Sequence, residues 1–97
     1  MAKKIIWSEK AQEDRKSIFR YWNQRNKSNN YSIKLNKLLE EAVIIIANYP
    51  KIAKRTKQQN VRIKIVRDYL IYFKELDEEI YILTIFSCHR NPANLKF

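Results

Sequence analysis

Three short apolar runs in the second half of the chain place the strongest constraint on its fold. They extend from Val61 to Val66, from Tyr69 to Lys74 and from Ile80 to Phe86, and polar residues separate them. Runs of this length, rich in β-branched and aromatic residues, predict a β-meander. The sequence contains no glycine, so we expect Asp68 and Asp77 to adopt the turn conformations that glycine usually takes.

The first of these runs alternates between apolar and basic residues. Val61, Ile63 and Ile65 occupy every second position, and Arg62 and Lys64 lie between them. Because successive side chains of a strand point to opposite faces, we expect the three apolar residues to face the core. Arg62 and Lys64 are then expected to lie side by side on the other face of the sheet.

The first half of the chain predicts one strand and two helices. Lys4 to Trp7 is expected to form a strand, and Ser8 to cap a helix that extends to about Arg25. Apolar residues at offsets of three and four predict a second helix that ends at Pro50. These residues are Tyr31, Leu35, Leu38, Ala42, Ile45, Ile46 and Tyr49.

Together these elements predict an α+β fold. An N-terminal strand is followed by an antiparallel two-helix hairpin, and a three-stranded antiparallel meander packs on the hairpin. The chain has 97 residues, which is enough for one modest core, so we expect a single domain over residues 1–97. The stretch from Lys51 to Asn60 is expected to be a polar connection without regular structure.

Positive charge is the strongest signal in the composition. The formal net charge is +10, and a surface of this kind attracts polyanions. No acidic residue occurs between Ala42 and Arg67, whereas the same stretch holds Lys51, Lys54, Arg55, Lys57, Arg62, Lys64 and Arg67. We expect this local block to bind nucleic acid or another anionic partner. The alternative is a solvated lysine-rich face that serves solubility.

Several classes of protein are not expected. The longest wholly apolar run, Ala42 to Ala47, is too short to cross a bilayer, and the N-terminus lacks the pattern of a signal peptide. Cys88 is the only cysteine, so no intrachain disulfide can form, and a cytoplasmic location is the default expectation. No spacing typical of metal ligands occurs, and no cofactor is expected.

His89 and Arg90 follow the last apolar run directly. Cleavage of RNA by its own 2′-hydroxyl needs a proton acceptor, a proton donor and cations that stabilise the phosphate. His89 is the only histidine and is suited to acid-base chemistry near neutral pH, and Arg90 can bind a phosphate in a bidentate manner. Tyr72 is a candidate for stacking on a base. The alternatives are a surface or capping role for His89, and ordinary strand packing for the tyrosine.

The order of these segments resembles the RelE/ParE superfamily of type II toxin-antitoxin modules. The resemblance covers nearly the whole chain. It is carried by Ile6 to Ala11, Tyr49-Pro50, Arg62 to Ile65, Tyr69 to Phe73, Ile82 to Phe86 and His89 to Pro92. The resemblance implies the α+β fold predicted above and a toxin that inhibits growth.

The two branches of the superfamily imply different activities. RelE-like members cut messenger RNA on the ribosome, and ParE-like members are understood to act on DNA gyrase. Arg62 and Lys64 match the basic pair of the nuclease pattern, and Arg90 matches its arginine after the last strand, with His89 beside it. Leu70 stands where the nuclease pattern has an arginine.

Two further features bear on the choice between the branches. The C-terminal end offers Phe97 rather than a tyrosine, and the long helical hairpin is more typical of ParE-like members.

The leading hypothesis from the sequence is a ribosome-dependent mRNA endonuclease with Arg62, Lys64, His89 and Arg90 as catalytic residues. Its rivals are a ParE-like gyrase inhibitor without nuclease activity and a degenerate toxin that only binds its antitoxin. The expected partners are a cognate antitoxin with an acidic or amphipathic segment, and either the ribosome with mRNA or gyrase. Alternatively, Arg62 and Lys64 serve to repel edge-to-edge strand pairing or to meet that antitoxin segment.

Overall fold

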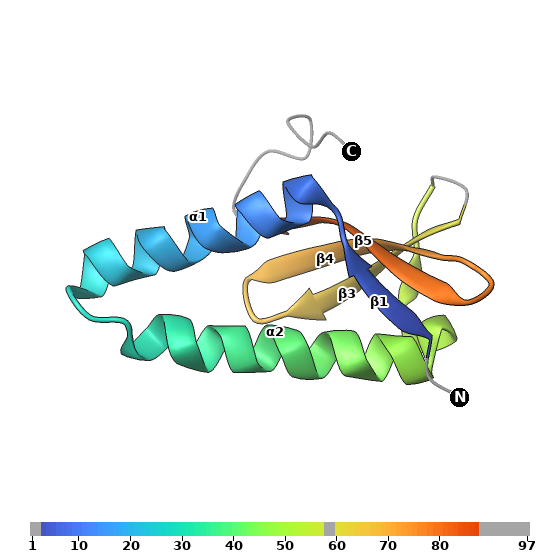
Figure 1. Ribbon diagram of the computed structural model, residues 1–97, viewed down its shortest axis with the longest axis horizontal. Coiled ribbons are helices and arrows are strands. Elements are labelled where there is room, and N and C mark those ends of the chain that lie inside the picture. The colour runs from blue at the N-terminus through green and yellow to red at the C-terminus, as the bar shows by residue number, and fades with distance from the viewer. Residues whose placement is uncertain (1–2, 58–59, 88–97) are drawn as a thin grey trace.

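In the computed structural model, which describes residues 3–57 and 60–87, a helical hairpin covers one face of a twisted β-sheet (Figure 1). The elements in chain order are β1 (Lys4–Trp7), α1 (Glu9–Asn26), α2 (Asn30–Asn48), the 3₁₀-helix η1 (Pro50–Ile52), β2 (Lys54–Arg55), β3 (Val61–Val66), β4 (Tyr69–Glu75) and β5 (Glu79–Ser87). The predicted α+β fold, its order of elements and the three-stranded meander are confirmed.

The five strands lie in the order β1-β5-β4-β3-β2. β3, β4 and β5 pair antiparallel, as a meander must, whereas β1 runs parallel to β5 with Ile5 opposite Ile80. The N-terminal strand therefore finds its partner in the last strand of the meander. β2 adds a short edge strand beside β3 within the stretch that was expected to be an unstructured connection.

The main core lies between the sheet and the helices. β4 and β5 contribute Ile71, Phe73, Ile80 and Ile82, and α2 contributes Leu35, Leu39 and Ile46, all of them fully buried. Burying a large apolar side chain contributes about 1.5–3 kcal/mol, so these residues dominate the stability of the fold. α1 adds Ala11, and Ile18, Phe19 and Trp22 of the same helix pack against the core.

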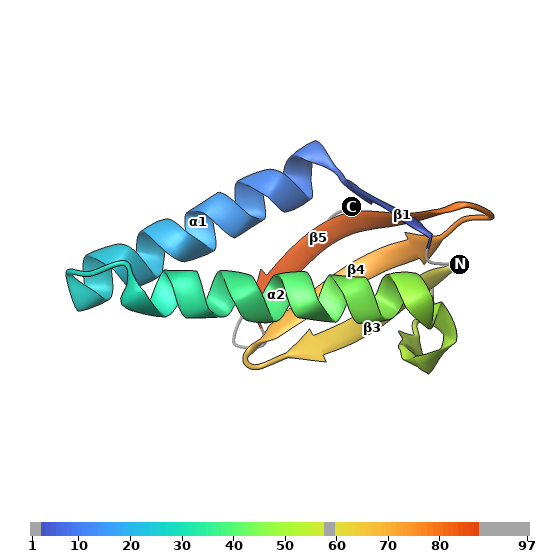
Figure 2. The same cartoon turned by 60° about the horizontal axis from the view of Figure 1, so that its bottom comes forward.

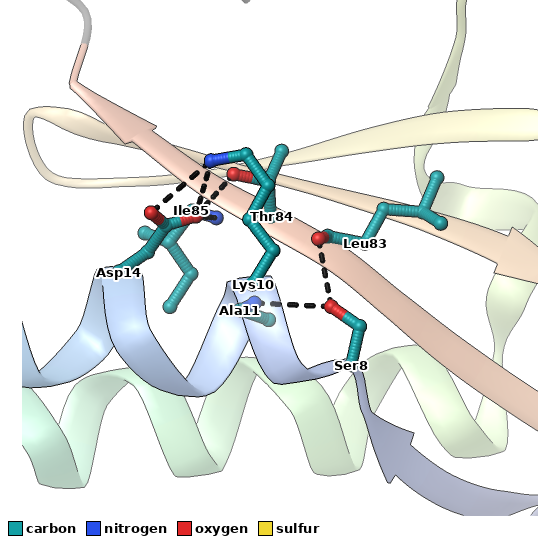
Figure 3. Close-up of polar contacts among 7 residues, drawn as sticks. All are labelled: Ser8, Lys10, Ala11, Asp14, Leu83, Thr84 and Ile85. Atoms are coloured by element: carbon teal, nitrogen blue, oxygen red, sulfur yellow. Dashed lines mark hydrogen bonds and ion pairs between the residues drawn. The ribbon is translucent and has the colours of Figure 1, made fainter. Parts of the chain in front are cut away.

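Ser8 joins the start of α1 to the sheet. As predicted, its Oγ accepts a hydrogen bond from the backbone N–H of Ala11 at 3.0 Å, which caps the helix. The same hydroxyl donates to the backbone carbonyl of Leu83 in β5 at 2.8 Å (Figure 3). Within residues 3–57 and 60–87, neither helix has the length and apolar character needed to span a lipid bilayer.

The tight turns use residues other than the two expected aspartates. In the part of the chain that the structure describes, the residues with positive φ are Lys27 at 52°, Asn60 at 65° and Arg67 at 57°. Val66 pairs with Tyr69, so Arg67 is the first of two turn residues, the position that requires positive φ in the turns that suit a hairpin. The expectation for Asp68 and Asp77 is wrong. The pairing register of the strands decides which turn residue has positive φ, and the preference of aspartate for that conformation does not.

Candidate functional site

The basic residues after α2 lie at the surface. Lys51 in η1, Lys54 and Arg55 in β2, and Lys57 after it are all exposed. Arg67 is exposed in the turn between β3 and β4. Their positive charges are therefore accessible to an acidic partner, and the prediction that they bind nucleic acid stays a prediction.

Arg62 is held inside the fold. Its Nη1 donates to the backbone carbonyl of Ala53 at 3.0 Å, and its Nε lies 3.8 Å from Oε1 of Glu75. Glu75 also pairs with Lys3 at 3.4 Å. Only 17% of the Arg62 side chain is exposed, so this guanidinium fastens the segment that leads into β2 and is already paired with a carboxylate.

Arg62 and Lys64 share the face of the sheet that the helices cover. In the β3–β4 register Arg62 lies opposite Phe73 and Lys64 opposite Ile71, and directly opposed residues of an antiparallel pair lie on the same face. Phe73 and Ile71 belong to the main core. We call this the inner face, and the other the outer face.

The predicted orientation of β3 is therefore wrong. Its alternation is as expected, but Arg62 and Lys64 point to the helix side, because the sheet is apolar on both faces and alternation alone does not identify the helix side. Val61 and Ile63 belong to a second, smaller cluster on the outer face, and Ile65 is 62% exposed.

The outer face is apolar where the nuclease pattern has an arginine. Leu70 lies opposite Ile65 and Phe86 and packs into the second cluster. Tyr72, the candidate for base stacking, is only 9% exposed there. The nearby side chains of this cluster thus provide packing rather than groups that transfer protons or bind phosphate.

His89 and Arg90 lie outside the described residues. Of the four residues predicted to be catalytic, the structure thus places Arg62 and Lys64, and it places both on the inner face, opposite to Leu70. No three histidine, cysteine, aspartate or glutamate side chains in the part of the chain that the structure describes are grouped to bind a metal ion.

A cavity of about 440 Å³ lies between α1 and the adjoining ends of β4 and β5. Trp22 and Tyr69 meet at its wall, where the indole Nε1 donates to the phenol oxygen at 2.7 Å. Burial raises the pKa of Tyr69 above its ordinary value. Asp14, Arg25 and Asp68 also line the cavity, so its charges are mixed. Local sequence patterns do not predict this contact, because 47 residues separate its partners.

Asp14 at the edge of this cavity connects α1 to β5. Its carboxylate accepts hydrogen bonds from the hydroxyl of Thr84, from the backbone N–H of Ile85 at 3.3 Å and from Nζ of Lys10 at 3.2 Å (Figure 3). Thr84 is fully buried. The carboxylate of Asp14 is thus occupied with contacts that hold α1 against β5.

This chain resembles known proteins in its sequence family and in its fold. The family model described as the ParE toxin of the type II toxin-antitoxin system parDE matches residues 5–92. The fold is similar to a solved structure described as a chromosomal ParDE TA system from P. aeruginosa, with a TM-score of 0.76 and 20% sequence identity. That similarity covers 89% of this chain and 96% of the other. No curated protein sequence matches significantly.

Proposed function

Because this chain belongs to the ParE family of type II toxins, we propose that it inhibits growth by binding DNA gyrase, and that a cognate antitoxin neutralises it. Membership of this family assigns the chain to a toxin-antitoxin system. Gyrase is the target that the ParE-like branch implies, and a protein that acts by binding needs a complementary surface rather than a set of catalytic groups.

The positions of Arg62, Lys64 and Leu70 support binding over RNA cleavage. A nuclease must bring its cations together on one phosphate. Here Arg62 and Lys64 lie on the inner face of the sheet, whereas Leu70, at the position of the missing arginine, lies on the outer face. Arg62 is moreover paired with Glu75. An mRNA endonuclease built as the sequence first suggested would have Arg62 and Lys64 on the helix side of the sheet, and an apolar residue at the position of the missing arginine.

The exposed basic segment suits the expected antitoxin. Lys51, Lys54, Arg55 and Lys57 are exposed on consecutive short elements, and an acidic segment that binds there would lower the net charge of +10. Complementary charge of this kind speeds association and selects the partner. The basic segment is thus assigned to the antitoxin, and the gyrase contact is a separate part of the proposal.

The test measures both activities on one preparation of the full chain. Increasing amounts are added to gyrase with relaxed plasmid, and in parallel to a translating extract whose transcript is mapped by primer extension. We expect supercoiling to stop, the transcript to stay intact, and added antitoxin to restore supercoiling. Cuts within translated regions that disappear in His89→Ala and Arg90→Ala, with gyrase unaffected, would instead establish the nuclease.

One control addresses the charge of the protein. A strongly basic chain can coat plasmid DNA and inhibit any enzyme that acts on it. Relaxation of the same plasmid by a type I topoisomerase is therefore measured at the same protein concentrations and salt. Equal inhibition of both enzymes would mean that the effect comes from DNA coating, and the gyrase proposal would fail.

A further inference from the structure

α2 presents an exposed stripe that no other described element covers. Ile33 is 62% exposed and Ile44 is 55% exposed, and Lys37 and Glu40 lie between them and are also exposed. The spacings of four, three and four residues place all four side chains on one face of the helix. In Figure 2, α2 runs along the front of the molecule, before the sheet.

The charges of α2 balance, unlike those of the whole chain. The helix carries Lys34 and Lys37 in its first half and Glu40 and Glu41 in its second half, so its net charge is zero, while the chain carries +10. The ion pairs found among the described residues involve none of these four side chains. This helix therefore carries no net charge of its own. The only hydrogen bond found for these four side chains among the described residues is the exposed one that Glu40 accepts from Asn36 at 3.2 Å.

The stripe is complementary to itself when two copies run antiparallel. A two-fold axis between Leu38 and Leu39 places Ile33 of one copy opposite Ile44 of the other. The same operation places Lys37 opposite Glu40, and both contacts occur twice. Residues spaced by three and four form the seam of paired helices, and a two-fold interface must match a surface to itself. From this complementarity we propose that a second copy of this chain binds along α2, forming a symmetric dimer.

The contact is small, and this determines how the dimer behaves. One pair of helices buries less surface than the roughly 1,600 Å² of a standard stable interface. The dimer should therefore form only at micromolar or higher concentrations. The proposal concerns self-association and is independent of gyrase, so the failure of either leaves the other intact.

The test uses sedimentation equilibrium of the full chain and of two charge-reversal variants. Lys37→Glu alone, or Glu40→Lys alone, places like charges opposite each other at both symmetric positions. We expect each variant to dimerise at least about tenfold more weakly than the wild type. An equal mixture of the two variants can form a mixed dimer. At one contact the new glutamate at position 37 faces the new lysine at position 40 of the other chain. At the other contact the unchanged Glu40 and Lys37 face each other. Dimerisation should return.

Recovery of the dimer on mixing shows that the charges act between molecules, because mixing cannot repair a chain that folds badly.

Ile44→Ser should also abolish the dimer, while Ile65→Ser, at a residue of similar exposure on β3, should leave it unchanged. Circular dichroism verifies that each variant is folded. A wild-type chain that remains monomeric at millimolar concentration, or a mixture that does not recover, overturns the proposal. So does an antitoxin that occupies this face while the free chain is monomeric.

Discussion

Replacing Asp14 by alanine should be among the more destabilising single substitutions on α1. The change removes the acceptor of two donors in β5, the hydroxyl of fully buried Thr84 and the backbone N–H of Ile85. A buried donor left without a partner costs about 1–3 kcal/mol, whereas the pair with partly exposed Lys10 adds little. The free energy of unfolding should therefore fall by about 3 kcal/mol, measured by urea titration with tryptophan fluorescence.

A double-mutant cycle tests the reasoning behind that figure. Thr84→Val removes the hydroxyl and keeps the volume of the side chain, so Asp14→Ala should cost less in this background, with a coupling energy of about 1–2 kcal/mol. Glu13→Ala is the matched control, because Glu13 neighbours Asp14 but its side chain is 70% exposed, and no measurable change is expected. A cost for Asp14→Ala below about 1 kcal/mol, with no coupling to Thr84, would refute the role assigned to this carboxylate.

Three further substitutions test the other contacts. Burial raises the pKa of Tyr69 in the folded state above the ordinary value of 10.0, so the folded state favours the neutral phenol. The stability that this preference contributes is fully present at pH values below the pKa of the unfolded chain. It is lost as the pH rises through the pKa of the folded state. Tyr69→Phe should lower stability at pH 8 by about 1 kcal/mol through the lost hydrogen bond and should show a shallower decline above pH 10 than the wild type in urea titrations. Arg62→Ala should lower the free energy of unfolding by about 1–2 kcal/mol and speed proteolysis after η1. An unchanged rate of cleavage would argue that Arg62 does not hold this segment in place. Lys54→Glu/Lys57→Glu should weaken antitoxin binding about tenfold at 0.15 M salt and less at higher salt, measured by calorimetry, whereas Lys16→Glu on α1 should leave affinity unchanged.

The sequence predicted the elements well because each carries its own local signal. Alternation marks β3, and the capping role of Ser8 follows from its position before a helical pattern. What could not be predicted depends on contacts between distant segments. The hydrogen bond from Trp22 to Tyr69 joins residues 47 positions apart, and that from Thr84 to Asp14 joins residues 70 positions apart.

The candidate site was the least predictable part for a related reason. Period-two alternation places Arg62 and Lys64 on one face but does not say which face the helices cover, since both faces of this sheet are apolar. The partner of Arg62 was equally hidden, because Glu75 becomes its neighbour only once β3 and β4 pair. His89 and Arg90 remain predictions outside the described residues.

The position of β5 has a consequence for how the protein comes into being. β5 is the last described strand to be synthesised, yet it lies between β1 and β4 and supplies the only strand partner of β1 in the described sheet. A chain still emerging from the ribosome lacks this strand, so β1 has no strand partner. Asp14 of α1 then cannot make its contacts with Thr84 and Ile85. Contacts between such distant segments also slow folding. Each molecule therefore becomes a folded toxin only after β5 has been translated. An antitoxin already present can bind the chain during the time between the synthesis of β5 and the completion of folding.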